Sequence, residues 1–111
     1  MPSDLADPAA VAGFLSEHPL CALYFTTPDC GVCKVLKPKL AEMLAERFPR
    51  VGFAQVDCAA APALAAEMGV FSVPTLIVFT RGRESLRKSR SFGLEELAGA
   101  LERPYRLLYE E

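Results

Sequence analysis

Two cysteines separated by two residues are the part of this sequence best suited to do chemistry. Cys30 and Cys33 enclose Gly31 and Val32, and this spacing lets the two sulfurs close a small disulfide ring when the second lies one turn into a helix. A thiolate attacks disulfides, and the free N–H groups at the start of a helix stabilise that anion. Gly31 permits a sharp turn and the close approach of a partner. We therefore predict thiol–disulfide exchange in which Cys30 attacks and the more buried Cys33 releases the product.

Zinc sites use the same cysteine spacing, so the remaining cysteines must be considered. Cys21 and Cys58 do not form a second pair of this kind, and His18 is the sole histidine. These residues favour redox chemistry with no metal and no bound cofactor. Zinc or an iron–sulfur cluster bridged between two chains stays open as an alternative. Cys21 is expected to be a small buried hydrophobe, whereas a redox or dimer-forming role for Cys58 is left open.

The pair must be positioned by a strand that ends before Cys30 and a helix that begins near it. Residues 20–26 form a continuous apolar run, typical of a strand buried on both faces, and Pro28 and Asp29 break it. An apolar stripe predicts the helix, which kinks at Pro38 and ends at Pro49. The stripe comprises Cys33, Leu36, Leu40, Met43, Leu44 and Phe48.

Further elements precede and follow this unit. Asp7 is expected to cap a helix that begins at Pro8 and stops at Pro19. Gly93 and Glu96 resemble a capping box that opens a last helix. The other predicted elements are strands at 51–56 and 75–79, a helix at 62–68, a turn at 81–82 and a polar strand at 84–90. This order predicts an α/β fold with a central mixed sheet flanked by helices on both faces.

The sequence resembles the thioredoxin family over about residues 8–102. The most specific shared segment is 72–76, Ser-Val-Pro-Thr-Leu, which is similar to the cis-proline segment of that family. Other shared features are the strand 22–25, the cysteine pair followed by Lys34, Pro38, Val56-Asp57, Pro62, Leu64, Ala65 and Gly69-Val70.

The resemblance implies a thioredoxin-like fold in which a cis Val73–Pro74 bond faces the cysteine pair. Gly31, Val32, Val73 and Pro74 are then expected to contact substrate. It further implies a protein-disulfide reductase that acts on protein disulfides and receives electrons from a thioredoxin-reductase-type donor. The alternative is a redox-sensing adaptor or chaperone-type binding module that uses the same groove with little turnover.

The departures from the family pattern lie close to the pair. Tyr24 stands at the position of a buried acid that helps activate the second cysteine, and Phe53 stands at that of its lysine partner. Asp29 replaces the tryptophan that usually precedes the first cysteine, and the chain contains no Trp. Asp29 disfavours a thiolate at Cys30 and Lys34 offsets this in part, so Tyr24, Asp29 and Lys34 are expected to tune the pair.

Composition and charge limit the partners. The 111 residues are 51% hydrophobic with a formal charge of −2, which suits one domain over 1–111 and gives no reason to expect nucleic acid. No apolar run reaches membrane-spanning length, and the first residues lack the features of a signal peptide. We therefore expect a cytoplasmic monomer without a membrane partner.

Two segments leave alternatives open. Residues 81–90 contain Arg81, Arg83, Arg87, Lys88 and Arg90. The simpler interpretation is a charged edge strand; the other is a docking edge for an acidic partner. In the family, the position of Arg90 often carries glycine near the substrate groove. The extension at 103–111 either continues the last helix past a kink at Pro104 or offers an apolar patch for self-association.

Overall fold

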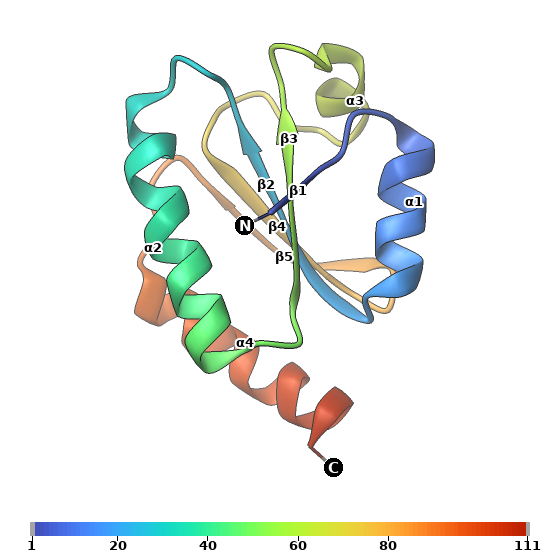
Figure 1. Cartoon of the computed structure of the whole chain (residues 1–111), viewed down its shortest axis with the longest axis vertical. Coiled ribbons are helices and arrows are strands. Elements are labelled where there is room, and N and C mark those ends of the chain that lie inside the picture. Colours follow the sequence, from blue (N-terminus) through green and yellow to red (C-terminus); the bar gives the residue numbers. More distant parts are fainter. Residues whose placement is uncertain (1, 111) are drawn as a thin grey trace.

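A five-stranded mixed sheet runs through the centre of the chain, with strand order β1–β3–β2–β4–β5 (Figure 1). The computed structural model describes residues 2–110. The strands are β1 Ser3–Asp4, β2 Leu20–Thr26, β3 Gly52–Asp57, β4 Thr75–Thr80 and β5 Arg83–Ser89. β3 pairs in parallel with β1 and β2, whereas β4 pairs antiparallel with β2 and β5. The charged strand β5 lies at the edge, as predicted.

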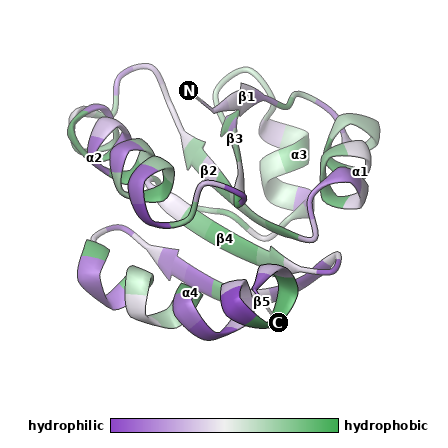
Figure 2. Cartoon of the chain, turned by 60° about the horizontal axis from the view of Figure 1, so that its bottom comes forward, coloured by the Kyte–Doolittle hydropathy of each residue, from purple (hydrophilic) through white to green (hydrophobic). Residues whose placement is uncertain are grey.

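Four helices cover the two faces of the sheet (Figures 1 and 2). They are α1 Pro8–Glu17, α2 Gly31–Arg47, α3 Pro62–Glu67 and α4 Leu94–Tyr109. α2 and α4 pack on one face, and α1 and α3 pack on the other. This arrangement confirms the predicted α/β architecture.

The strand β2 supplies side chains to both layers of the core. Leu20, Ala22 and Tyr24 pack under α2 and α4, while the alternate residues, with Leu23 and Phe25 among them, pack against α1 and α3. Residues 20–25 are all buried because helices cover both faces. Each large apolar side chain buried in this way stabilises the fold by roughly 1.5–3 kcal/mol.

Local signals placed several boundaries correctly. The Asp7 carboxylate accepts a hydrogen bond from the Ala10 N–H at 2.8 Å, which confirms the cap of α1. α2 continues through Pro38, as the constant phase of its apolar stripe predicted. It begins at Gly31, two residues before the stripe. The stripe leaves out Gly31 and Val32 because both face solvent.

Other sequence expectations were wrong or incomplete. The capping box at Gly93 does not form, since glycine has no side chain to accept a bond, and Glu96 instead pairs with Lys88 at 3.2 Å. The polar strand predicted to end at about Arg90 does end there, at Ser89, and Arg90 follows it with a positive φ of 68°. The two-residue strand β1 was missed, as two polar residues carry no periodic pattern.

The extension after Pro104 continues α4 without interruption to Tyr109. The Tyr105 hydroxyl accepts a hydrogen bond from the Arg50 N–H at 3.2 Å, and the Tyr109 hydroxyl accepts one from the Leu20 N–H at 3.3 Å. The Arg50 guanidinium lies 4.3 Å from the centre of the Tyr109 ring. These contacts attach the end of α4 to the first residue of β2 and to the segment that precedes β3.

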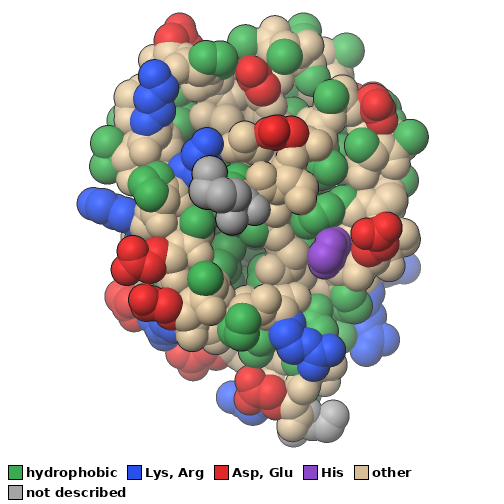
Figure 3. Space-filling model, viewed as in Figure 1, with side chains coloured by type: hydrophobic (Ala, Val, Ile, Leu, Met, Phe, Trp, Pro, Cys, Tyr) green, Lys and Arg blue, Asp and Glu red, His purple; other side chains and the backbone are tan. Residues whose placement is uncertain are grey.

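The surface shows charges of both signs. On the face seen in Figure 3, acidic and basic side chains are interspersed with apolar ones. From residue 2 to residue 110, the structure contains no helix with the length and apolar character needed to cross a bilayer.

Gly52 is predicted to be intolerant of alanine. A Cβ at this position would lie 2.6 Å from His18 Cγ and 2.8 Å from His18 Cβ. The backbone-attached Cβ of His18 cannot rotate away, so Gly52→Ala is expected to lower the free energy of unfolding by about 1–3 kcal/mol. Urea denaturation measures this loss.

The matched control is Gly99→Ala on α4, where an added Cβ meets nothing within 4 Å. Its helical position predicts a gain of about 0.5–1 kcal/mol. Equal effects of the two substitutions would contradict the assigned packing of Gly52 against His18.

Candidate active site

Cys30 and Cys33 form a disulfide across the start of α2, with their Cα atoms 5.3 Å apart. Cys30 is the N-cap residue, and its Sγ accepts a hydrogen bond from the Cys33 N–H at 3.1 Å. Its carbonyl accepts the Lys34 N–H at 3.2 Å. Cys30 is half-buried, whereas Cys33 is only 1% exposed. One accessible sulfur therefore lies at the positive end of the helix dipole, with a buried sulfur behind it.

A tight turn between β2 and α2 sets Cys30 at this helix end. β2 ends at Thr26, and the Cys30 N–H donates to the carbonyl of Thr27 at 3.2 Å. Pro28 and Asp29 are the central residues of the turn, where proline presets the φ that the first central position requires. The sequence thus converts a buried strand into an exposed helix start over a few residues.

The cis-proline segment lies at the same end of the sheet. The Val73–Pro74 bond is cis, as predicted. Thr75, the first residue of β4, pairs with Phe25 near the end of β2. The Thr75 hydroxyl donates to the carbonyl of Ser72 at 2.8 Å, which holds the backbone before Pro74.

The four predicted contact residues lie on the two segments that meet at this end of the sheet. Gly31 and Val32 are exposed on the first turn of α2, whereas Val73 is half-buried and Pro74 is buried. Arg90 connects the two segments. Its N–H donates to the Pro74 carbonyl at 2.6 Å, and it lines a groove together with Gly31 and Val32.

Tyr24 contacts the second cysteine through the backbone. It is fully buried, and its hydroxyl donates to the Cys33 carbonyl at 3.0 Å. Phe53 packs edge-on against it with ring centroids 6.4 Å apart, so the two substituted family positions are neighbours in space. Burial raises the pKa of Tyr24 to about 12. The phenol is therefore protonated at neutral pH, and position 24 supplies no base for the Cys33 thiol.

A cavity of about 430 Å³, lined by both apolar and charged residues, lies beside Cys33. Its lining includes the charged side chains of Asp4, Lys34, Lys37 and Asp57. Lys37 Nζ donates to Gln55 Oε1 at 3.1 Å, and the Gln55 amide donates to Asp4 Oδ1 at 2.6 Å. Sequence reasoning missed Asp4 and Gln55 as neighbours of the site. Only the pairing of β1 with β3 brings them together, and no pattern in the sequence revealed it.

The two predicted tuning charges flank Cys30 along the chain. Asp29 and Lys34 are both exposed. Within residues 2–110 neither belongs to an ion pair. Because water screens exposed charges, each acts only weakly on the Cys30 sulfur.

Cys21 and Cys58 are free thiols. Burial raises the pKa of Cys21 to about 12, which agrees with the inert hydrophobe expected there. Cys58 is half-buried after β3, and burial together with the Asp57 carboxylate raises its pKa. In the part of the chain that the structure describes, no group of three or more His, Cys, Asp or Glu side chains is placed to hold a metal.

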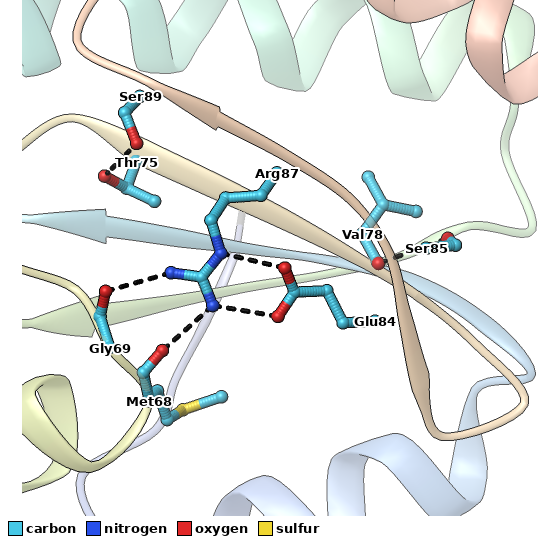
Figure 4. Close-up of polar contacts among 8 residues, drawn as sticks. All are labelled: Met68, Gly69, Thr75, Val78, Glu84, Ser85, Arg87 and Ser89. Carbon is cyan, nitrogen blue, oxygen red and sulfur yellow. Dashed lines mark hydrogen bonds and ion pairs between the residues drawn. The ribbon is translucent and has the colours of Figure 1, made fainter.

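Arg87 on β5 ties the edge strand to the loop that leads to the cis-proline (Figure 4). Its guanidinium donates to the carbonyls of Met68 at 2.9 Å and Gly69 at 3.1 Å, and it also binds both carboxylate oxygens of Glu84 at 2.8 Å. These carbonyls follow the last turn of α3, where backbone acceptors lack helical partners. The bond from Arg87 lowers the pKa of Glu84. Residues 70–74 thus start from a fixed position, a role that the sequence did not indicate.

Ionisation of Tyr24 is predicted to be delayed. The absorbance of phenolate near 295 nm, taken as wild type minus Tyr24→Phe, should rise at about pH 12 rather than near the ordinary value of about 10. Because the unfolded chain loses this proton first, the free energy of unfolding should fall as pH rises between those two values. A difference curve centred near pH 10 would contradict the burial of the phenol.

Loss of the Arg87 contacts is predicted to loosen the loop before Pro74. Arg87→Met leaves the Met68 and Gly69 carbonyls without their donor, so the free energy of unfolding should fall by about 1–2 kcal/mol. Amide exchange in residues 70–73 should also accelerate. The control is Arg83→Met on the same strand, since Arg83 is exposed and has no ion pair among the described residues. An equal loss of stability in Arg83→Met would refute the role of Arg87 in holding the Met68 and Gly69 carbonyls.

Known proteins resemble this chain in sequence. A sequence model of the thioredoxin family matches residues 9–103. The chain is 32% identical over 98 residues to thioredoxin-like protein YdfQ of Bacillus subtilis, covering 88% of this chain and 87% of that protein. It is 31% identical over 80 residues to a bifunctional thioredoxin reductase/thioredoxin of Mycobacterium leprae, covering 72% of this chain and 18% of that protein.

A solved structure gives the same result. A mutant thioredoxin from Halobacterium salinarum NRC-1 superposes with a TM-score of 0.82 at 27% identity, covering 91% of this chain and 88% of that one. With a disulfide closing the C-x-x-C motif at the start of α2, these matches show that the chain belongs to the thioredoxin family and is a thiol–disulfide oxidoreductase that exchanges or reduces protein disulfides through Cys30 and Cys33.

Proposed function

We propose that Cys30 is the attacking sulfur and Cys33 the resolving sulfur of this oxidoreductase. The observation that carries the proposal is the asymmetry of the pair. The half-buried Cys30 caps α2 and its Sγ accepts the Cys33 N–H at 3.1 Å, whereas Cys33 is 1% exposed. The hydrogen bond and the helix dipole both favour an anion at position 30.

The reaction then proceeds in two exchanges. The Cys30 thiolate attacks one sulfur of the substrate disulfide, forms a mixed disulfide and expels the other substrate sulfur as a thiolate, which takes up a proton. The Cys33 thiol loses its proton and attacks the Cys30 sulfur, and the second substrate thiolate leaves. Two electrons have passed to the substrate, and the Cys30–Cys33 disulfide seen in the structure is the oxidised product.

Deprotonation of Cys33 receives no help from a base at position 24. Tyr24 stays protonated, and its hydroxyl donates a hydrogen bond to the Cys33 carbonyl. Water in the cavity beside Cys33 takes the proton. Lys34 and Lys37 at that cavity favour the thiolate by their charge, whereas the Asp4 and Asp57 carboxylates in the same lining oppose it. Asp29 opposes the Cys30 thiolate from the preceding position. Tyr24, Asp29 and Lys34 are thus the tuning residues, and product release is slower than attack.

The substrate chain contacts the residues on either side of the disulfide. Gly31 leaves room for it beside the sulfurs, and the exposed Val32 offers an apolar contact. The backbone of Val73 pairs with the substrate chain ahead of the cis Pro74. The support for this set is the shared position of the two segments at one end of the sheet.

The electron donor is a thioredoxin-reductase-type enzyme, and the protein works in electron transport as a cytoplasmic monomer. The relative from Mycobacterium leprae, whose name joins a thioredoxin reductase to a thioredoxin, supports such a donor. Cys21 and Cys58 are free thiols, which suits a reducing compartment. The strongly exposed large apolar side chains among the described residues are Val32, Val35, Phe71 and Leu107.

The assigned roles predict different behaviour for the two cysteine variants. In a glutathione redox titration with thiol counting, the wild type should form one intramolecular disulfide that is absent in both Cys30→Ser and Cys33→Ser. With a disulfide substrate, Cys33→Ser should accumulate a mixed disulfide at Cys30, whereas Cys30→Ser should accumulate none. Mass spectrometry of trapped species identifies the linked residue.

Cys58→Ser is the matched control and should retain the wild-type disulfide. Trapping at Cys33 or Cys58 would show that the roles are wrong. Turnover with a thioredoxin reductase and NADPH should exceed that of an equal concentration of dithiothreitol. If it does not, the domain acts as a redox-sensing adaptor or chaperone-type module that binds partners without reducing them.

A further inference from the structure

We propose that a groove beside the cysteine pair selects client disulfides that carry an acidic and an apolar residue near the attacked cysteine. This selectivity rests on the proposed function, because it concerns the clients of Cys30. The α2 groove, as we term it, has a volume of about 570 Å³. Its lining includes Gly31, Val32, Val35, Lys39, Arg90 and Phe92.

The position of the α2 groove places it in the path of a bound client. Gly31 and Val32, the residues between the two cysteines, form part of one wall. Arg90 and Phe92 come from the segment between β5 and α4, which passes beside α2 (Figure 1). The Arg90 N–H donates to the Pro74 carbonyl at 2.6 Å. A client chain that lies across the cysteine pair and Pro74 therefore continues into the α2 groove.

The groove offers an apolar surface to such a chain. Val32 and Val35 lie one turn apart on α2 and are 59% and 60% exposed. Phe92 contributes a half-buried ring from the other wall. Burial of an apolar client side chain here removes exposed apolar surface from water on both partners.

Two cations at the groove give the selectivity for acidic clients. Lys39 and Arg90 are both exposed, and neither is in an ion pair among the residues that the structure describes. Glu95, which lines a neighbouring pocket with Lys39, is held by Arg47 at 3.0 Å, whereas Glu42, one turn along α2 from Lys39, is in no ion pair of the described residues and faces the same pocket. Arg90 is therefore the stronger of the two cations for a client carboxylate. A client carboxylate can thus pair with Arg90, and Lys39 adds positive charge at the same groove.

The backbone of Arg90 does not require an arginine at this position. Its φ is 68°, in the left-handed region that glycine adopts freely and that disfavours an arginine. A glycine would satisfy the bond to Pro74 equally well, so the arginine adds only its side chain.

The test compares two peptide disulfides of one sequence that differ by Glu or Lys beside the reactive cysteine. At low salt the wild type should show kcat/KM about threefold to tenfold higher for the Glu peptide, and the preference should shrink at high salt. Arg90→Gly with Lys39→Gln should bring the ratio close to one. Arg90→Gly should fold normally, because glycine accepts the positive φ without strain.

Arg81→Gly is the matched control. Arg81 also has a positive φ, of 53°, and also donates its N–H to a proline carbonyl, that of Pro19. It lies in the hairpin turn between β4 and β5. Its replacement removes the same single positive charge as Arg90→Gly. This variant should keep the wild-type ratio. An equal rate for both peptides in the wild type, or an undiminished preference in the double variant, would overturn the proposal.

Two further measurements separate this proposal from the proposed function. Turnover of the neutral bis(2-hydroxyethyl) disulfide by the wild type tests the chemistry alone. An NMR titration with cysteine-free Glu and Lys peptides tests the α2 groove alone, and only the Glu peptide should shift the Arg90 and Val35 amides. Groove binding without turnover would support the groove and defeat the proposed function. Turnover with no charge preference would support the proposed function and overturn the selectivity of the α2 groove.

Discussion

The fully buried strand β2 is the constraint on which the functional arrangement depends. A slip of one residue would exchange the side chains under α2 and α4 with those under α1 and α3, so its register is fixed by the core. Phe25 consequently stays opposite Val56 on one side and Thr75 on the other. The turn that carries Cys30 and the segment that carries Pro74, far apart in the sequence, meet because one strand pairs with both of its neighbours.

Much of this architecture could be predicted because its signals are local. The apolar run of β2 and the cap at Asp7 each depend on a few adjacent residues. Cys30, Cys33 and Pro74 were found through spacing and family resemblance. By contrast, the bond from Gln55 to Asp4 and the clamp of Arg87 on Met68 exist only after strands have paired or packed. No periodicity could reveal them, because Gln55, Asp4 and Arg87 are ordinary polar residues in the sequence and the acceptor at Met68 is a backbone carbonyl.

The two sulfurs receive unequal help from the protein. The helix start stabilises negative charge at Cys30 through one N–H bond and the backbone dipoles. Cys33 lies above a phenol that cannot act as a base near neutral pH. The aromatic pair of Tyr24 and Phe53 occupies the two positions at which the family pattern has an acid and its lysine partner, so this core holds no buried ion pair there. At position 24, an aromatic side chain that packs well in the core thus takes the place of a base that could deprotonate Cys33.

The attachment of α4 has a consequence for protein synthesis. Leu97 and Leu101 cover the same core face as Tyr24 and Cys33, and Tyr109 receives a bond from the backbone at the start of β2. A nascent chain that has emerged from the ribosome only as far as β5 still exposes this apolar face. This face therefore becomes covered only when residues 94–109 have followed, so the growing chain presents it to other chains until α4 has formed.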